Sequence, residues 1–321
     1  MKWSAISRTE RIINVENNET KNELFSKTWF PGHMQKTKRI IRDNVKLVDV
    51  VIELLDARVP LSSRNPLISE LVGAKPVIVA LNKSDLADPA VTKSWQEYFK
   101  GNGISAITID AMSGKGLKQL TAIATKLSKS KTEKFVSKGG NVRSARAMVV
   151  GIPNVGKSSL INKLSGASKA KVENRPGVTR DKQWIRIANG LELLDVPGIL
   201  WPKLDDPLVG LKLAFIGSIS DEAVDIAAVA HELFKFIVKY YPDNIAARYK
   251  LTAEQLKYDN NDLLELIGQK RGCIQKGGII DVEKVYRVLV TDFRSGKLGK
   301  ISFDRPDEVI VSNTDSDTEE Q

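Results

Sequence analysis

Residues 151–158 read GIPNVGKS, a spacing of glycine and lysine that predicts a phosphate-binding loop. Two glycines separated by four residues let consecutive backbone N–H groups turn inward around phosphates at the start of a helix. Lys157 is expected to reach the terminal phosphates, and the hydroxyl of Ser158 to bind Mg²⁺. The residues predicted to surround the phosphates are Asn154, Val155, Gly156, Lys157, Ser158 and Ser159.

A second segment, Asn82-Lys83-Ser84-Asp85, has the residue types that would recognise guanine. The Asp85 carboxylate can accept hydrogen bonds from both the N1–H and the exocyclic amine of guanine, whereas adenine offers no such pair of donors. The stem of Lys83 would pack over the base, and Asn82 would brace the neighbouring loops. This base loop follows the apolar run PVIVAL, at the edge where α/β sheets bind ligands.

Two short patterns further along the chain could complete a GTP/GDP site with Mg²⁺. Asp195, in DVPG, can hold the metal through water, and Gly198 can present its N–H to the γ-phosphate. Thr179, in PGVT, lies between the phosphate loop and Asp195, where a mobile segment would bring a threonine to Mg²⁺. Each pattern is weak alone, and Thr179 by itself would be an ordinary turn residue. Together they predict a nucleotide site.

Apolar periodicity predicts the elements that must position these loops. Continuous apolar runs predict buried strands, and helical spacing predicts a helix that opens at Asp88-Pro89 and another that Gly166 closes. A third short helix has Ser62 or Ser63 as its expected cap. The strands are expected at 49–57, 76–82, 104–110 and 146–150, other helices at 32–48 and 115–129, and a hairpin at 181–195. This alternation implies an α/β fold with a parallel sheet between helices.

The base loop precedes the phosphate loop, the reverse of the usual order in P-loop GTPases. A polar, basic, glycine-bearing stretch at residues 130–144 predicts a linker. Because loops join the strands of a sheet, a chain can be cut at one loop and closed at another without changing which residues meet. The sequence therefore predicts a P-loop GTPase domain with circularly permuted motifs.

The character of the sequence changes near residue 205, after which the apolar segments have the period of helices. We therefore expect an additional, all-α domain. The four expected parts are a polar extension (1–28), the GTPase domain (29–205), a helical RNA-binding domain (206–303) and an acidic disordered tail (304–321).

Composition narrows the class of protein. Of 321 residues, 42% are hydrophobic and 27% charged, typical of a globular protein with a core. No apolar run is long enough for a membrane span and no secretory signal is visible, so we expect a cytoplasmic protein without a membrane partner. A single cysteine, Cys273, excludes an internal disulfide. Each basic stretch alone is more typical of a solvated face, but three of them together with the net charge of +10 favour a polyanion such as RNA.

Six segments together resemble the ribosome biogenesis GTPase A family (YlqF/RbgA). They are WFPGHMQKTKR, DVVIELLDARVPLSSRNP, NKSDL, GIPNVGKSSLIN, PGVT and LLDVPGIL. The resemblance covers residues 29–303 and leaves residues 1–27 without a counterpart. It implies a bacterial GTP-hydrolysing factor in late maturation of the large (50S) ribosomal subunit, which binds pre-ribosomal particles in a GTP-dependent way. It also implies that the helical domain contacts 23S rRNA, and the family has mitochondrial relatives.

The resemblance also bears on catalysis. The position that often carries a water-orienting glutamine after Asp-x-x-Gly is Ile199 here. The family motif makes His33, in WFPGHM, the candidate for this role, whereas without the family it would be an ordinary packed or exposed histidine. His231 lies in an amphipathic helix and is expected to be structural.

Two further expectations follow from the resemblance. Asn154 resembles the asparagine with which potassium-activated GTPases hold K⁺ beside the phosphates, the alternative being a turn-stabilising role. Residues 110–116 (DAMSGKG) take the place of the fifth GTPase motif. Because Asp110 replaces its usual serine, the backbone N–H groups of Ala111 and Met112 are the expected contacts to the guanine oxygen. Arg58 and Arg64 match family positions without an assigned chemistry.

Three functions remain open at this point. The first is a GTPase timer that docks on a pre-ribosomal particle and leaves after hydrolysis. The second is an RNA-binding module whose affinity the nucleotide gates. The third is a GTPase of the mitochondrial ribosome or a signalling GTPase with a protein partner. Sedimentation with large subunits in the presence of different nucleotides separates them.

Overall fold

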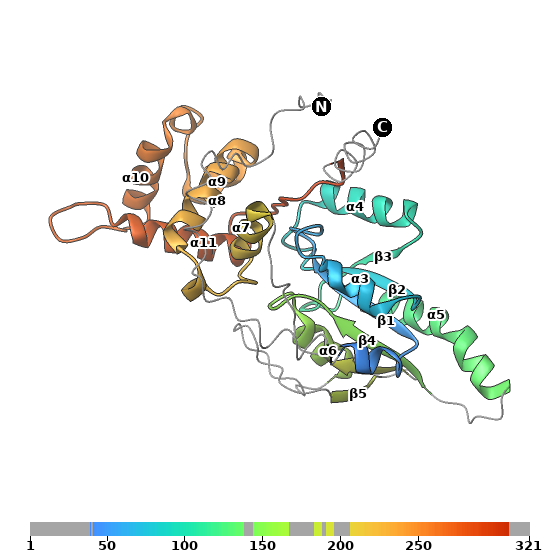
Figure 1. Cartoon of the computed structure of the whole chain (residues 1–321). Coiled ribbons are helices and arrows are strands. Elements are labelled where there is room, and N and C mark those ends of the chain that lie inside the picture. The colour runs from blue at the N-terminus through green and yellow to red at the C-terminus, as the bar shows by residue number, and fades with distance from the viewer. Residues whose placement is uncertain are drawn as a thin grey trace, which may run out of the picture. The chain divides into compact units, whose positions relative to one another are not determined.

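The computed structural model of the chain describes residue 39 and residues 41–137, 144–166, 183–187, 191–195 and 206–307. Of these, residues 206–299 form one compact unit, and the remainder, including residues 300–307, form a second. The second unit contains a six-stranded sheet with helices, and the first is built from helices (Figure 1). The α/β fold and the all-α C-terminal domain predicted from the sequence are both present.

The sheet has the strand order β3-β2-β1-β4-β6-β5. All neighbours run parallel except β5 and β6, which form the predicted antiparallel hairpin. All seven residues of the central strand β1 are buried, as expected for a parallel strand covered on both faces. The strands are β1 (Val50–Asp56), β2 (Val77–Asn82), β3 (Ser105–Thr108), β4 (Ala145–Val150), β5 (Gln183–Ile187) and β6 (Leu191–Asp195).

Helices cover the sheet and set the ends of its strands. Helix α4 (Pro89–Gly101) begins where the sequence predicted, because the Asp88 carboxylate accepts hydrogen bonds from the N–H groups of Ala90 (2.8 Å) and Val91 (3.3 Å). Its buried Trp95 and Phe99 pack against apolar side chains of β1 and β2. The other helices of this unit that are labelled in Figure 1 are α3 (Pro66–Val72), α5 (Leu117–Ser137) and α6 (Lys157–Ser165).

Two local expectations differ from the structure. Helix α5 continues to Ser137, so the first eight residues of the expected linker at 130–144 are helical. Helix α3 begins at Pro66, and neither serine caps it. Instead, Ser63 Oγ accepts the N–H of Asp56 at 3.1 Å, while Ser62 donates to Asp304. Both hydroxyls form hydrogen bonds with buried polar groups. Leaving a buried group without a hydrogen bond costs more free energy than leaving an exposed helix end without a cap.

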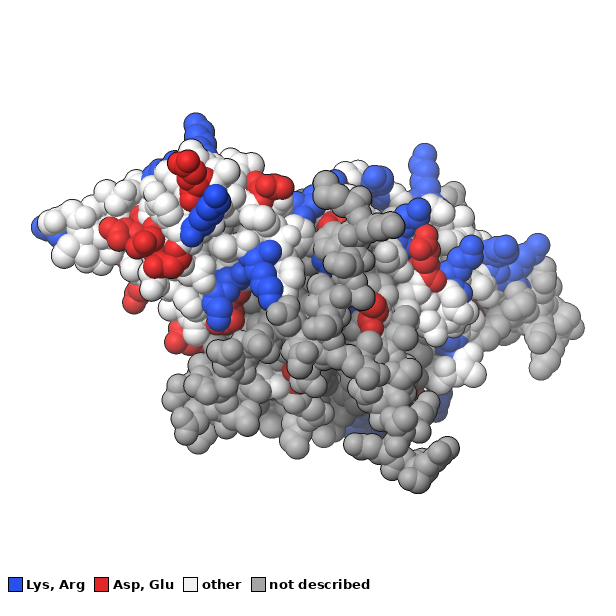
Figure 2. Space-filling model, turned by 90° about the horizontal axis from the view of Figure 1, so that it is seen from above, with Lys and Arg blue, Asp and Glu red and all other residues white. Residues whose placement is uncertain are grey.

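The surface carries charges of both signs. On the face seen in Figure 2, lysine and arginine side chains are interspersed with aspartate and glutamate. Three exposed pairs at helical spacing are Arg39–Asp43, Lys93–Glu97 and Arg287–Glu283. Such exposed pairs contribute little to stability.

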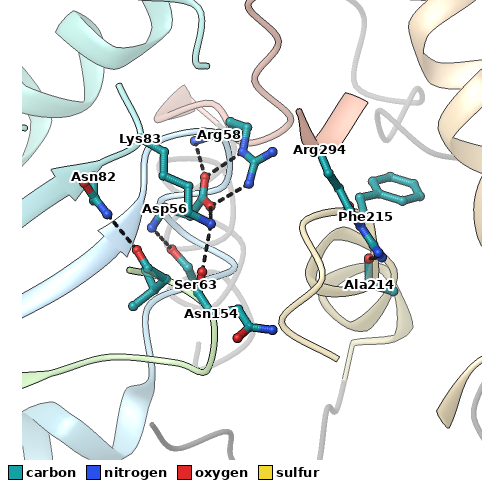
Figure 3. A network of polar contacts seen from close by, with 10 residues as sticks. Asp56, Arg58, Ser63, Asn82, Lys83, Asn154, Ala214, Phe215 and Arg294 are labelled. Carbon is teal, nitrogen blue, oxygen red and sulfur yellow. Dashed lines mark hydrogen bonds and ion pairs between the residues drawn. The ribbon is translucent and has the colours of Figure 1, made fainter. Parts of the chain in front are cut away.

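The helical unit has its own core and its own polar contacts between helices. Arg294, the last residue of α11, donates to the carbonyl oxygens of Ala214 (2.8 Å) and Phe215 (3.0 Å) at the end of α7 (Figure 3). It also pairs with Asp221. A cation at these carbonyls complements the negative end of the α7 dipole. The helices are α7 (Pro207–Phe215), α8 (Ile226–Tyr240), α9 (Pro242–Tyr249), α10 (Asn260–Lys270) and α11 (Val282–Arg294). No helix in the described parts of the chain is both long and apolar enough to cross a membrane.

The segment after the helical unit returns to the sheet unit. The Ile301 N–H donates to Leu86 O (3.1 Å), and the Phe303 N–H donates to Arg58 O (2.8 Å). The Asp304 carboxylate accepts from both the N–H and the hydroxyl of Ser62, and the Asp304 carbonyl accepts from the Trp95 indole. The sequence placed residues 300–303 in the helical domain and 304–307 in a disordered tail. The buried contacts of this return segment, residues 300–307, place it with the sheet instead.

Candidate functional site

The base loop and the phosphate loop meet at the carboxyl edge of the sheet. Asn82, the last residue of β2, donates its side-chain amide to the carbonyl oxygen of Val155 at 2.8 Å. Its side-chain oxygen accepts the N–H of Ala111 at 3.0 Å. Asn82 is buried, so one side chain joins three loops that are far apart in the chain. The bracing predicted for Asn82 is confirmed.

The phosphate loop connects β4 to α6 with the geometry that anion binding needs. Gly156 has φ +103° and precedes the helix without a side-chain cap, so the first N–H groups of α6 point toward the loop. Asn154 also has a left-handed backbone, with φ +57°. The nearly buried Lys157 donates its ammonium to the carbonyl oxygens of Ile152 (2.9 Å) and Gly151 (3.3 Å). The cation thus lies within the loop that is predicted to hold the phosphates.

Lys83 links the base loop to the phosphate loop a second time. Its Nζ donates to the carbonyl oxygen of Asn154 at 2.8 Å and lies 3.0 Å from the Asp56 carboxylate (Figure 3). Its backbone is left-handed, with φ +58°. Asp85, two residues on, is exposed. The base loop therefore has a lysine held in place near its start and an accessible carboxylate two residues later. Recognition of guanine requires such an accessible carboxylate.

In the fifth motif, residues 110–116, the Asp110 side chain accepts hydrogen bonds from the backbone of its own loop. Asp110 Oδ1 accepts the N–H groups of Met112 (2.8 Å) and Ser113 (3.2 Å). Burial would raise the pKa of the Asp110 carboxyl, but hydrogen bonds from Ser113 and Met112 outweigh it and lower the pKa. The N–H of Ala111 goes to Asn82, so both N–H groups predicted to reach the guanine oxygen donate within the protein here. Their contact with guanine stays a prediction, and it requires a shift of this loop.

Known proteins are similar to the chain over most of its length. Ribosome biogenesis GTPase A of Bacillus cereus is 49% identical over 280 residues, which span 87% of this chain and 94% of the relative. The chain belongs to the ribosome biogenesis GTPase A family. The sequence model of a family described as 50S ribosome-binding GTPase matches residues 146–268.

Solved structures of the ribosome biogenesis GTPase A family resemble the chain as well. A GDP-bound structure of TM YlqF has a TM-score of 0.59 and 32% identity, and covers 84% of this chain and all of that one. A GNP-bound YlqF from T. maritima has a TM-score of 0.56 and 30% identity over 84% of this chain and 98% of that one. These similarities, with the order of β2 and β4 in the chain, confirm the circularly permuted GTPase fold.

Several predicted site residues of this family member lie outside the described residues. They are His33, Thr179 and Gly198, and Ile199 is also among them. The backbone of Asp195 ends β6, paired in register with Val149 of β4, so it lies on the strand next to the one that feeds the phosphate loop. Its side chain is not described. The parts that those residues play remain predictions.

The described residues fit a magnesium ion at the phosphates. Ser158 is half-buried in the first turn of α6, directly after Lys157. In the parts of the chain that are described, no three His, Cys, Asp or Glu residues gather into a metal-binding group. Mg²⁺ usually keeps several waters and binds through few protein oxygens together with substrate phosphates, so a single hydroxyl and one carboxylate are sufficient.

The sequence analysis missed one part of the site of this family member, the Asp56 carboxylate under Lys83. Asp56 ends β1, is fully buried, and forms a two-pronged ion pair with Arg58, with distances of 2.8 and 2.9 Å. A signal was present, because an aspartate that ends a continuous apolar strand must find a cation or lose its charge. Arg58 had no assigned role in the sequence analysis, and it has this one in the structure.

Gly156→Ala is expected to weaken nucleotide binding at least tenfold. A Cβ at this position would overlap the side-chain nitrogen of Asn82. The amide group of Asn82 is held by two hydrogen bonds, one through its nitrogen and one through its oxygen, and it cannot move without breaking them. Losing these two hydrogen bonds costs about 1 kcal/mol each. Together this corresponds to nucleotide binding that is weaker by roughly tenfold to thirtyfold. Titration with a fluorescent GDP measures the change.

Gly166→Ala is the matched control for Gly156→Ala. Gly166 ends the same helix and is also left-handed, with φ +64°, but a Cβ there meets nothing within 4 Å. Both variants therefore pay the conformational cost of a left-handed alanine, about 1–2 kcal/mol. Equal affinities in the two variants would contradict the bracing argument.

Proposed function

We propose that this chain is a GTPase that acts in the assembly of the large ribosomal subunit, docking on the particle with GTP bound and leaving after hydrolysis. It hydrolyses GTP to GDP and phosphate. The observation that carries the proposal is the direct contact of Asn82 and Lys83 with the phosphate loop, which brings a guanine-recognition sequence to a phosphate-binding sequence across the edge of the sheet. The names of the relatives supply the assembly process.

The proposed roles in the nucleotide site combine the geometry of the described loops with the sequence motifs of the other residues. Asp85 accepts the two guanine donors, and Lys83 covers the base. Lys157 moves from its loop carbonyls to the β- and γ-phosphates, where its positive charge offsets the negative charge that develops in the transition state. Mg²⁺ neutralises phosphate charge when bound, held by Ser158 and, in the proposal, by Thr179 and Asp195. Gly198 donates its N–H to the γ-phosphate.

Two roles in hydrolysis are proposed for residues that do not hold the phosphates directly. His33 orients the attacking water, since Ile199 has no group able to do so. Asn154 holds a K⁺ ion beside the phosphates, in the position that its left-handed backbone gives it in the loop. If the His33→Ala variant hydrolyses GTP at the wild-type rate with saturating ribosomal subunits, the proposed role of His33 is wrong. Equal turnover in potassium and sodium buffers removes the second.

The proposed partner is the large subunit and its 23S rRNA, and the proposed location is the cytoplasm. A net charge of +10 supports a polyanionic partner. Basic residues exceed acidic ones strongly in residues 36–46, 126–146 and 270–300. The face in Figure 2 has charges of both signs, so the support comes from the total and from the relatives rather than from that face.

Co-sedimentation with free large subunits tests the proposed function. With a non-hydrolysable GTP analogue, most of the protein is expected in the large-subunit fraction, and with GDP several-fold less. Binding is expected to fall steeply as salt rises, because Lys and Arg contacts to phosphates release counterions. Nucleotide-dependent binding to RNA without any stimulation of GTP hydrolysis by subunits would favour the RNA-binding module instead. Absence of the protein from the subunit fraction under all nucleotides would exclude the ribosomal role.

A further inference from the structure

Asp56 lies at the junction of the three strands that build the nucleotide site. It ends β1, whose neighbours are β2 on one side and β4 on the other. In the parallel register it pairs with Asn82, the first residue of the base loop. The chain of β4 continues into the phosphate loop. A side chain at the end of β1 is therefore between the loop that reads the base and the loop that holds the phosphates.

The Asp56 carboxylate is shared between two cations. The guanidinium of Arg58 binds both of its oxygens, at 2.8 and 2.9 Å, and the Lys83 ammonium is 3.0 Å from Oδ2 (Figure 3). Two backbone N–H groups add to this arrangement. The N–H of Arg58 donates to Asp56 Oδ1, and the N–H of Asp56 donates to the hydroxyl of Ser63. The carboxylate is thus fixed from several directions, and it cannot follow Lys83 if that lysine moves.

The charge balance makes Lys83 depend on Asp56. Burial would raise the pKa of Asp56, but the charges of Arg58 and Lys83 outweigh it and hold that pKa well below its usual range. If the negative charge were lost, the two cations would face each other without compensation. The Arg58 side chain is 2% exposed and that of Lys83 is 24% exposed. Lys83 has the shorter route to solvent, so it is the side chain that would leave.

We propose that Asp56 is a positioning residue for guanine recognition, which acts by fixing the Lys83 side chain between itself and the Asn154 carbonyl before the nucleotide arrives. The inference rests on the proposed function of the base loop. Lys83 is a long side chain with many rotamers, and ordering it only on binding would weaken the affinity. Because Asp56 orders Lys83 in advance, this loss of affinity is avoided. Asp56 contacts Lys83 and not the phosphates, so it is expected to affect nucleotide affinity and not the rate of hydrolysis.

The test is a double-mutant cycle of Asp56→Asn and Lys83→Met, with the affinity for GDP and GTP and single-turnover hydrolysis as readouts. Asp56→Asn is expected to weaken both affinities about tenfold, with hydrolysis of bound GTP within about twofold of wild type. In the Lys83→Met background the same mutation is expected to change affinity less than twofold, because the residue through which it acts is already absent. Equal losses in both backgrounds, or wild-type affinity in Asp56→Asn, would overturn the proposal.

Asp49→Asn is the matched structural control. Asp49 immediately precedes the other end of β1, is 3% exposed, and accepts the N–H of Arg146 at 3.0 Å. It is expected to lower the melting temperature without changing nucleotide affinity. If Asp56→Asn does not fold, Asp56→Glu replaces it in the cycle, since it retains the charge for Arg58 but displaces the partner of Lys83. If wild type binds ADP as tightly as GDP, the proposed function of the base loop fails, and this inference fails with it.

Discussion

Lys157→Ala is expected to slow GTP hydrolysis by about 100- to 1,000-fold, the usual cost of removing one preorganised group that stabilises transition-state charge. Lys157 is 7% exposed and its ammonium lies 2.9 and 3.3 Å from two carbonyl oxygens of the phosphate loop. It therefore lies within the loop that is proposed to hold the phosphates. Single-turnover hydrolysis at saturating GTP measures the change.

Lys93→Ala is the control for the Lys157 variant. Lys93 is on α4 with a side chain that is 77% exposed, and it pairs only loosely with Glu97 at 3.9 Å. Its removal changes the net charge by the same amount and should leave hydrolysis unchanged. If Lys157→Ala hydrolyses GTP within about threefold of wild type, residues 151–158 do not act as a catalytic phosphate loop.

Asp85→Asn is expected to lower the affinity for GTP by about 10- to 100-fold, because hydrogen bonds to a charged group contribute about 1.5–3 kcal/mol. The asparagine retains one acceptor but presents a donor where guanine also has a donor. Xanthine has a carbonyl oxygen in that place, so the variant is expected to prefer xanthine nucleotides. Competition of GDP and XDP against a fluorescent nucleotide measures both changes.

The control for Asp85→Asn is Glu97→Gln, which removes one negative charge from a side chain that is 68% exposed on α4. It should bind GTP as wild type does. A parallel loss of affinity for guanine and xanthine nucleotides in Asp85→Asn would mean that the residue supports the loop rather than reads the base.

The strands and loops of the site were predictable because their signals are local. An apolar run such as residues 77–81 predicts a buried strand by itself, and Asn82 directly after it is placed at the sheet edge by the end of that strand. The cap of α4 was predictable for the same reason, since Asp88 and Pro89 act within one turn. Even the join of base loop to phosphate loop followed, because parallel strands bring their carboxyl ends to one edge.

Other features depend on contacts between distant residues. The approach of Lys83 to Asp56 is set by the register of β1 against β2, which no short stretch of sequence specifies. The end of α5 was misplaced because polar composition was taken for a linker, although no glycine or proline interrupts the helix before Gly139. The return segment was missed because Ile301 and Phe303 have an apolar environment only where the sheet unit provides it.

The return of residues 300–307 to the sheet unit makes the helical unit an insertion rather than an appended domain. Both ends of the segment 206–299 are joined along the chain to residues of the sheet unit, so two covalent connections hold the inserted helices. If the chain were cut between residues 196 and 205, the downstream fragment would still be attached through the contacts of Phe303 and Asp304. A truncation at 205 is a different change, since it would strip Trp95 and Ser62 of their partners beside the base loop.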